Sequence, residues 1–258
     1  MPDEVEVPLA GGNASAGVVR VGDTVRRPSG PWTPAVHALL GHLRSVGFRG
    51  APRVLGIDER GREVLEFVPG LVVWPEHVEL MEADDLLVRV GRLIRELHDA
   101  VSGFRPPADA RWQVVVPSDG DEIVAHHDLA PWNLVVDGER CTFIDWDTLA
   151  PGTRLGDLAY AAHGFVPLSA DPRWPRADAG RRLRVLVDAY GLDEGQRRRL
   201  VPLLAQRTRA MHDFLAEQAA AGTLPWARLW REGHGAVWLA DTDFIEQRTD
   251  TWTRALLD

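Results

Sequence analysis

The segment 126–147 constrains the fold of this chain more than any other part of it. Two short apolar runs, 134–136 and 141–144, lie on either side of an Asp-Gly turn. Runs of β-favouring residues around such a turn are typical of a β-hairpin. Asn133 and Asp145 lie equally far from the middle of the turn. A symmetric hairpin would therefore place these two side chains opposite each other at its open end.

The residues at this open end suit a divalent cation. An amide oxygen from Asn133 and a carboxylate from Asp145 are hard ligands of the kind that Mg²⁺ prefers. Asp128 lies five residues before Asn133, in a segment that Pro131 keeps from continuing as a helix. We therefore predict a metal site at Asn133 and Asp145, with Asp128 beside it and free to act as a base. An isolated Asp in a turn is usually only a turn former, so the prediction depends on the combined spacing.

This combination resembles the aminoglycoside phosphotransferase family of small-molecule kinases. The resemblance is strong from Val124 to Ala159 and weaker from about residue 5 to 100. It implies an α+β, two-lobed protein-kinase-like fold. A small, mostly antiparallel β N-lobe would span 1–68, and a larger, mostly helical C-lobe would span 69–258. The matching motifs are His126-x-Asp128-x4-Asn133, Ile144-Asp145-Trp146-Asp147 and Gly156-Asp157-Leu158-Ala159.

The resemblance also implies roles around the catalytic loop. Asp128 would take the proton of an acceptor hydroxyl, and His126 would brace the loop. Asp157 would bind the loop backbone, although its place before an apolar run also fits a helix N-cap. Asp147 would act either as a metal ligand or as support for one.

The chain contains no lysine, and all 29 of its basic residues are arginine. Kinase-like enzymes normally place a strand lysine on the nucleotide phosphates. In the register of the resemblance, Arg26 or Arg27 falls at that position, and arginine can bind phosphate through its fork of N–H groups. Only one of two adjacent strand residues can face the cleft, and we expect Arg26 to do so. Both arginines could instead be solvated residues of an edge strand.

Two further segments are candidates for the nucleotide site. The loop containing Gly11, Gly12 and Asn13 lies between two predicted strands and could lay its N–H groups over phosphates, although most such loops only connect strands. By resemblance, the strand that ends at Glu66, Phe67 and Val68 is the hinge, where backbone groups meet the adenine. The helix after Pro34 carries no acid before Gly47, so the usual glutamate partner of the lysine is also missing, and His37 is the nearest polar candidate.

The second lobe is predicted to be mostly helical. Apolar spacing predicts helices over 84–101, 181–190, 194–221 and 226–247, with a loop over 102–121. Trp226, Trp230 and Trp238 fall near helical spacing. Core packing is their ordinary explanation, and a stacking wall for a ligand is the alternative. The acids of these helices, such as Asp213, Glu217 and Asp241, could bind a basic substrate or could form a solvated helix face.

Composition bounds the function. A net charge of −9 argues against nucleic-acid binding. No apolar run reaches the length of a membrane span, and no signal-peptide pattern begins the chain. Cys141 is the only cysteine, so a cytoplasmic location is expected.

Two functions are consistent with the motifs and the composition. The first is an Mg²⁺-dependent O-phosphotransferase that moves the γ-phosphate of ATP or GTP to a small-molecule hydroxyl, as in antibiotic resistance. The second is a non-catalytic immunity or binding protein that sequesters a peptide or small-molecule toxin.

Overall fold

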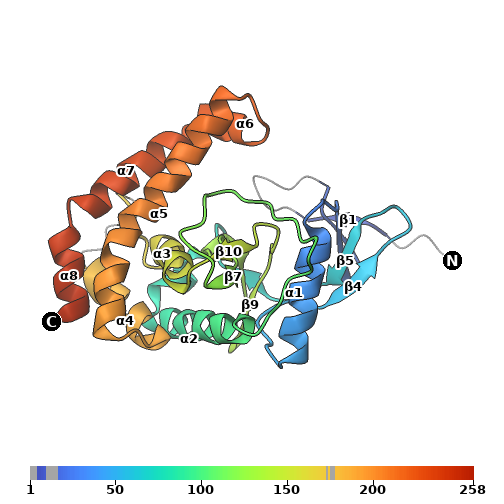
Figure 1. Cartoon of the computed structure of the whole chain (residues 1–258), viewed down its shortest axis with the longest axis horizontal. Helices are drawn as coiled ribbons and strands as arrows, with labels where there is room; N and C mark the ends of the chain where they lie inside the picture. Colours follow the sequence, from blue (N-terminus) through green and yellow to red (C-terminus); the bar gives the residue numbers. More distant parts are fainter. Residues whose placement is uncertain (1–4, 10–16, 173, 175–177) are drawn as a thin grey trace.

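The computed structural model describes residues 5–9, 17–172, 174 and 178–258. An antiparallel sheet with one helix forms the N-terminal part, and helices dominate the C-terminal part (Figure 1). This arrangement confirms the predicted α+β class. None of the helices in the described part of the chain is both long and apolar enough to span a membrane.

The first sheet has five strands in the order β1-β2-β3-β5-β4, and all neighbours are antiparallel. Side chains alternate between its faces, so the last two residues of β3 point in opposite directions. Arg27 is buried, whereas Arg26 is partly exposed. The strands are β1 (Val7–Pro8), β2 (Val19–Val21), β3 (Thr24–Arg27), β4 (Val54–Ile57) and β5 (Glu63–Glu66).

Helix α1 (Thr33–Ser45) connects β3 to β4 and carries the apolar stripe expected from the sequence. Val36, Leu39, Leu40 and Leu43 are buried. Proline in the first turn suits this helix because the amide hydrogen that proline lacks would have no helical partner there. The helix contacts α2 (Asp84–Val101), so it joins the first sheet to the helical part.

The chain leaves the first sheet after Glu66 and enters a second one at β6 (Leu71–Val72), which pairs with β8 (Leu134–Asp137). This crossing lies around the predicted lobe boundary at residue 69. Whether the segments 1–68 and 69–258 behave as separate units stays a prediction. β8 and β9 (Arg140–Phe143) form the predicted hairpin. β7 (Ile123–Ala125) and β10 (Ala150–Gly152) pair beside it.

The hairpin differs from the predicted one by a single residue of register. Asp137 pairs with Arg140, so the loop contains only Gly138 and Glu139. Gly138 has φ +54°, a conformation that glycine adopts without steric cost. Because the centre of the turn moves by half a residue, Ile144 rather than Asp145 lies across from Asn133. The Ile144 N–H accordingly donates to the Asn133 carbonyl oxygen at 2.9 Å.

The C-terminal helices pack around α2 and α5 (Figure 1). α5 begins with a capping box in which Asp193 and Gln196 bind each other's backbone N–H groups. α6 and α7 replace the single predicted helix over 226–247, because Gly233 between them has φ +92°. The helices are α3 (Arg154–Phe165), α4 (Ala179–Tyr190), α5 (Glu194–Ala220), α6 (Trp226–Arg231), α7 (His234–Glu246) and α8 (Thr249–Leu257).

Candidate active site

Asp128 lies in the loop between β7 and the short 3₁₀ turn Pro131–Asn133, and its carboxylate is held on both oxygens. The Tyr160 hydroxyl donates to Oδ1 at 2.8 Å. The Asn133 amide donates to Oδ2 at 2.7 Å and to the Asp128 carbonyl at 3.0 Å. Trp132 Nε1 lies 3.4 Å from Oδ2, and its side chain is partly exposed. The loop therefore fixes the orientation of this carboxylate.

The surroundings of Asp128 also tune its acidity. Burial raises the pKa of Asp128 to about 7, with a further contribution from the negative charge of Asp145. The hydrogen bonds from Tyr160 and Asn133 lower this pKa and so limit the rise. A carboxylate with a pKa near neutrality can both accept and release a proton at physiological pH, which suits a general base.

Asn133 and Asp145 both lie at the open end of the hairpin, where Ile144, the neighbour of Asp145, pairs with Asn133. Asn133 is buried, and its amide nitrogen is directed to Asp128. Asp145 has φ +58°, an unusual backbone conformation for a residue other than glycine. Such conformations cluster at functional sites, where the surrounding structure must hold them in place.

The oxygens that remain fit a magnesium ion. Among the described residues, neither Asn133 Oδ1 nor Asp145 Oδ2 has a hydrogen-bond donor or an ion-pair partner. No group of three or more His, Cys, Asp or Glu in the described part of the chain could hold a metal by itself. Mg²⁺ needs only one or two protein oxygens when nucleotide phosphates and water complete its shell. Asn133 and Asp145 supply such a partial set.

Arg27 is buried beside Asp145 and Asp147. Its Nη1 donates to Asp145 Oδ1 at 3.1 Å, and its Nη2 contacts Asp147 Oδ2. Its Nε lies 3.3 Å from Glu63 Oε2. Although burial opposes its charge, the carboxylates of Asp145, Asp147 and Glu63 hold the pKa of Arg27 above the ordinary arginine value. The guanidinium is therefore a permanent positive charge between three acids.

The expectation that Arg26 faces this cleft is not met. Arg26 Nη1 instead lies 3.8 Å from Asp58, on the other face of the strand. The pairing of β3 with β5 sets Arg27 directly across from Glu63, which carries both side chains to the inner face. The acid of the pair thus comes from strand β5 and not from helix α1. That helix contributes His37, whose Nε2 lies 2.9 Å from Glu63 Oε1.

Asp147 belongs to the same charged cluster. Burial raises the pKa of Asp147 to about 6, while Arg27 lowers it and the charges of Asp145 and Glu63 raise it. Its contact with Arg27 suits a supporting position beside Asp145. Its role as metal ligand or support stays a prediction.

Asp157 ties the catalytic loop to the helical part. Its Oδ2 accepts a hydrogen bond from the His126 N–H at 3.1 Å, and its Oδ1 accepts one from the His127 N–H at 2.9 Å. His98 Nε2 lies 3.1 Å from Oδ2. Burial opposes the charge of Asp157, but His98 and the loop hold its pKa well below the ordinary value. Asp157 lies inside α3, and Thr153 is the N-cap, so the N-cap alternative is wrong.

His126 supports the loop through packing and backbone contacts. Its ring lies 4.6 Å from the Trp146 ring, centroid to centroid, and burial lowers its pKa. Its Nδ1 accepts a hydrogen bond from the Asp128 N–H at 3.3 Å. A neutral, buried imidazole of this kind positions Asp128 and does not itself carry charge into the site.

Arg207, on α5, approaches the catalytic loop from the helical side. Its Nη2 donates to the carbonyl of His127 at 3.0 Å, and His127 itself has φ +65°. Its guanidinium carbon lies 4.6 Å from the centre of the Tyr160 ring. Burial lowers the pKa of Arg207. The residue therefore holds the strained His127 backbone and the tyrosine that binds Asp128.

The role of the predicted hinge in binding adenine stays a prediction. The N–H groups of Glu66 and Phe67 donate to Arg53 and Asp23, respectively. Within the described residues, the Val68 N–H has no hydrogen-bond partner. The Arg20 guanidinium carbon lies 3.8 Å from the centre of the Phe67 ring. Gly11, Gly12 and Asn13 lie outside the described residues.

The three acids predicted for substrate binding have different environments. Asp213 and Glu217 are exposed on α5. Asp241 is only 3% exposed and cannot meet a substrate directly. It lies 2.9 Å from His163 Nε2 and accepts hydrogen bonds from Ser169 Oγ and Ala170 N, each at 2.8 Å.

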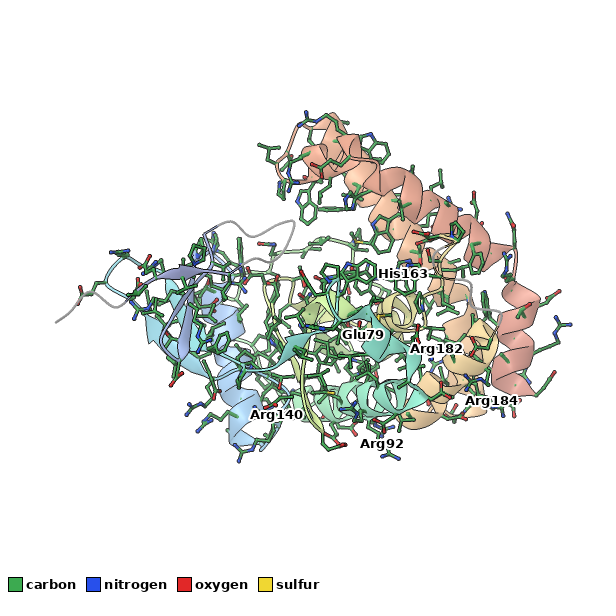
Figure 2. The ribbon with its side chains drawn as sticks, turned by 180° about the vertical axis from the view of Figure 1, so that it is seen from behind. Glu79, Arg92, Arg140, His163, Arg182 and Arg184 are labelled. Carbon is green, nitrogen blue, oxygen red and sulfur yellow. The ribbon has the colours of Figure 1, made fainter. Side chains whose placement is uncertain are left out.

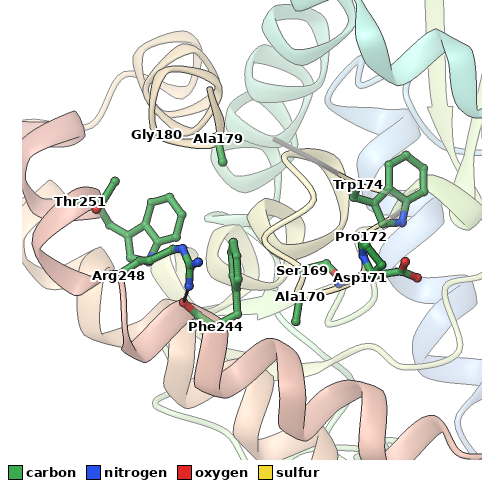
Figure 3. A pocket seen from close by; sticks show the side chains of 11 residues that line it. Ser169, Ala170, Asp171, Pro172, Trp174, Ala179, Gly180, Phe244, Arg248 and Thr251 are labelled. Atoms are coloured by element: carbon green, nitrogen blue, oxygen red, sulfur yellow. Dashed lines mark hydrogen bonds between the residues drawn. The ribbon is translucent and has the colours of Figure 1, made fainter. Parts of the chain in front are cut away.

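Ser169 and Ala170 also line a cavity of about 340 Å³ beside α7 and α8 (Figure 3). The Arg248 guanidinium in this cavity lies over the Phe244 ring and donates to the Phe244 carbonyl at 3.2 Å. His163, labelled in Figure 2, lies within the helical part. These contacts assign Asp241 a structural function in joining α7 to the segment after α3.

Trp226, Trp230 and Trp238 are partly buried rather than fully enclosed, and Trp238 packs against a cluster of buried residues as core packing predicts. Trp238 stacks on His163 with ring centroids 4.6 Å apart and lies 6.1 Å from Tyr160 in a parallel orientation. Trp226 meets Phe214 edge-on at 5.0 Å. Tyr160, which binds Asp128, therefore stacks with Trp238 between α3 and α7.

Sequence reasoning missed Tyr160, Glu63 and Arg207. Tyr160 lies one helical turn after Asp157, so the 3.6-residue period could have placed both on one face. Glu63 lies directly across from Arg27, but that pairing depends on a strand register that no local pattern specifies. Arg207 lies far from the motif in sequence, and no signal marks it.

An acid on the loop after β7, an amide and a carboxylate at one end of a hairpin, and an arginine on a strand match the arrangement expected of a kinase-like site. Comparisons with known proteins agree. Residues 108–200 match the phosphotransferase enzyme family. The chain is 34% identical over 254 residues to the trifolitoxin immunity protein of Rhizobium leguminosarum bv. trifolii, covering 91% of this chain and 94% of that protein. The chain belongs to this family of small-molecule kinases.

Solved structures confirm the kinase-like fold. A choline/ethanolamine kinase family protein from Mesorhizobium loti has a TM-score of 0.64 at 17% identity, covering 95% of this chain and 90% of that one. An amicoumacin kinase in complex with AMP-PNP, Ca²⁺ and Ami also has a TM-score of 0.64, at 14% identity with 97% and 89% coverage. The GDP complex of aminoglycoside 2'-phosphotransferase-IIIa has a TM-score of 0.57 at 14% identity, with 92% of both chains covered.

Proposed function

We propose that this protein is an Mg²⁺-dependent O-phosphotransferase that moves the γ-phosphate of ATP or GTP to a hydroxyl of a small molecule. The observation that supports the proposal is a chain of contacts that links Asp128 to Asn133, Asn133 to the neighbour of Asp145, and Asp145 to Arg27. Each side chain is held by a separate contact, and the oxygens that a cation would need remain available.

Asp128 would act on the acceptor. An acceptor hydroxyl would give its proton to the carboxylate as its oxygen bonds to the γ-phosphorus and the bond to the leaving nucleoside diphosphate breaks. Each carboxylate oxygen has two lone pairs, so Asp128 can take this proton while Tyr160 and Asn133 remain bound. A metal held by Asn133 and Asp145 would neutralise phosphate charge when bound. Most of the catalysis would come from positioning and charge.

Arg27 would supply the phosphate contact that lysine gives in related enzymes. It already lies beside Asp145, and its fork can bind two phosphate oxygens at once. The backbone of Glu66 and Val68 would meet the base, with Phe67 between them. The acceptor would lie beside Asp128, on the side of the carboxylate that Tyr160 does not occupy. An antibiotic acceptor would make the protein a resistance kinase.

A second candidate function is favoured by the relative named trifolitoxin immunity protein. A protein on this scaffold could give immunity by sequestering a toxin without transferring phosphate. The two functions differ in their need for Asp128. A sequestering protein would protect cells equally well with Asp128→Asn, whereas a phosphotransferase would lose protection with this variant.

Nucleotide binding is the decisive first experiment. The melting temperature would be measured with ATP or GTP, each with and without Mg²⁺, because a ligand of the native state must raise it. We expect an Mg²⁺-dependent rise with at least one nucleotide. No rise with either nucleotide would reject the phosphotransferase and favour the binding protein. Transfer would then be measured with ³²P-labelled nucleotide against hydroxyl-containing antibiotics and amino alcohols.

A further inference from the structure

A cavity of about 490 Å³ opens beside the end of α1, and its lining does not include Asp128, Tyr160 or Trp238. Its lining is apolar where the chain is buried and basic where the chain is exposed. Leu40 is 2% exposed and Phe48 is partly buried. The exposed part of the lining contains four arginines, namely Arg44, Arg49, Arg53 and Arg140.

The charge of this cavity is opposite to that of the whole chain. Glu66 is the only acid in its lining, and Arg53 Nε already lies 3.0 Å from it. In the described part of the chain, Arg44, Arg49 and Arg140 have no carboxylate partner. Arginines on exposed helices elsewhere commonly pair within one turn, as Arg95 does with Asp99 at 2.8 Å. Three unneutralised cations around one cavity, in a chain of net charge −9, indicate a site for a negatively charged ligand.

Both parts of the fold contribute to this cavity, and contacts between them hold its shape. Arg44 belongs to α1, whereas Arg140 begins β9 of the hairpin. Figure 2 shows Arg140 beside the end of α1. The Phe143 N–H donates to the Gly50 carbonyl at 2.9 Å, and Arg140 Nη2 lies 3.5 Å from the Arg49 carbonyl. The hairpin is thus joined to the segment between α1 and β4, and the cavity forms without a ligand.

We propose that this cavity binds a short acidic peptide segment with one apolar side chain. Guanidinium groups bind carboxylates through paired hydrogen bonds. An inorganic anion would leave the apolar surface of Leu40 and Phe48 uncovered, whereas an apolar side chain would bury it. A long polyanion such as nucleic acid would extend beyond the cavity along a chain whose net charge is −9. The inference is independent of the proposed phosphotransfer.

Fluorescence polarisation at low ionic strength would test this site with the labelled peptide Glu-Glu-Leu-Glu-Glu. We expect the double variant Arg44→Glu/Arg140→Glu to weaken binding by about tenfold or more, which corresponds to about 1.4 kcal/mol. A peptide with glycine in place of leucine should bind at least about threefold more weakly, because the apolar contact is lost. Citrate at the same carboxylate concentration should compete poorly.

Arg199→Glu is the matched control, because Arg199 is exposed on α5 and lies outside the cavity lining. It should leave peptide binding unchanged, and unchanged melting temperatures would verify the fold of all variants. The proposal would be overturned by the absence of peptide binding to the unmodified protein. Three further results would overturn it. Arg199→Glu could weaken peptide binding as much as Arg44→Glu does, the glycine peptide could bind as tightly as the leucine peptide, or citrate could compete strongly.

Discussion

Arg27 of the first sheet and Asp145 of the hairpin region form an ion pair across the cleft, with Nη1 and Oδ1 3.1 Å apart. The cation that would bind phosphate and the carboxylate that would bind metal therefore neutralise each other in the protein alone. We expect a bound nucleotide with Mg²⁺ to break this ion pair, because the guanidinium would then bind phosphate and Asp145 would bind the metal.

The first prediction concerns the two neighbouring arginines. Arg27→Ala should raise the Kd for nucleotide by about tenfold or more, whereas Arg26→Ala should change it little, because Arg26 lies on the Asp58 side of the strand. Isothermal titration calorimetry would measure both. Loss of Arg27 also removes the guanidinium from Asp145, Asp147 and Glu63, of which Glu63 keeps His37, so a fall of about 3 kcal/mol in the free energy of unfolding is expected.

Arg27→Lys separates these two effects. Lysine restores the charge without the fork, so it should recover most of the stability and part of the nucleotide affinity. If Arg26→Ala weakened nucleotide binding as much as Arg27→Ala did, the phosphate contact would have to be reassigned.

The second prediction concerns the proposed base. Asp128→Asn should lower the transfer rate by at least about 10²-fold and leave nucleotide affinity nearly unchanged, because Asp128 would serve the acceptor. Single-turnover transfer and calorimetry would measure the two quantities. Asp137→Asn, an exposed change in the same hairpin, is the control. Full activity in a folded Asp128→Asn protein would reject the assignment.

The third prediction concerns pH. The base works only when deprotonated, so the transfer rate should rise as pH increases through about 7, the pKa of Asp128. The Tyr160 hydrogen bond lowers that pKa. Tyr160→Phe should therefore move the acid limb of the pH profile upward by about one unit, the size expected for a hydrogen bond to a charged group.

A titration of the Asp128 carboxyl carbon by ¹³C NMR would give the same shift without any need for activity. An unchanged midpoint in Tyr160→Phe would show that the hydroxyl does not stabilise the charged form of Asp128.

The fourth prediction concerns metal. Asp145→Ala should abolish the Mg²⁺-dependent part of the thermal shift with nucleotide, and Asn133→Ala should reduce it, because both would contribute oxygen ligands. The increase in melting temperature between EDTA and Mg²⁺ would measure this. A full Mg²⁺ effect in both variants would place the metal on other groups.

The fifth prediction concerns the loop support. Asp157→Asn should lower the free energy of unfolding by about 2 kcal/mol or more, because an amide cannot accept all the hydrogen bonds that the carboxylate receives. The pKa of Asp157 is lowered in the folded protein, so its stabilisation is present above the ordinary carboxyl value of 3.8 and is lost only as pH falls well below it. Urea unfolding of both proteins at pH 7 and pH 3 would test this.

The catalytic loop and the hairpin could be predicted because their residues are close in sequence. The turn at Gly138 and the short strands around it place Asn133 and Asp145 at the same end of the hairpin by local rules, with an error of one residue in register. The motif around Asp157 could be predicted only by resemblance, since its hydrogen bonds cross from α3 to the loop.

Contacts that depend on distant elements could not be predicted. The choice between Arg26 and Arg27 depends on how β3 pairs with β5. The burial of Asp241 depends on His163 in α3 and on Ser169 and Ala170 in the segment after α3. A charge pattern on a helix does not reveal such a partner, so Asp241 and an exposed acid such as Asp213 look alike in sequence.

The guanidinium of Arg27 also changes how this cleft can be studied chemically. Reagents that label kinases by acylating the amine near the phosphates would find no side-chain amine anywhere in the chain. A survey that detects kinases by such labelling would pass over this protein even with nucleotide bound. Reagents that target arginine, such as phenylglyoxal, would report on occupancy of the cleft instead, through protection of Arg27 by nucleotide.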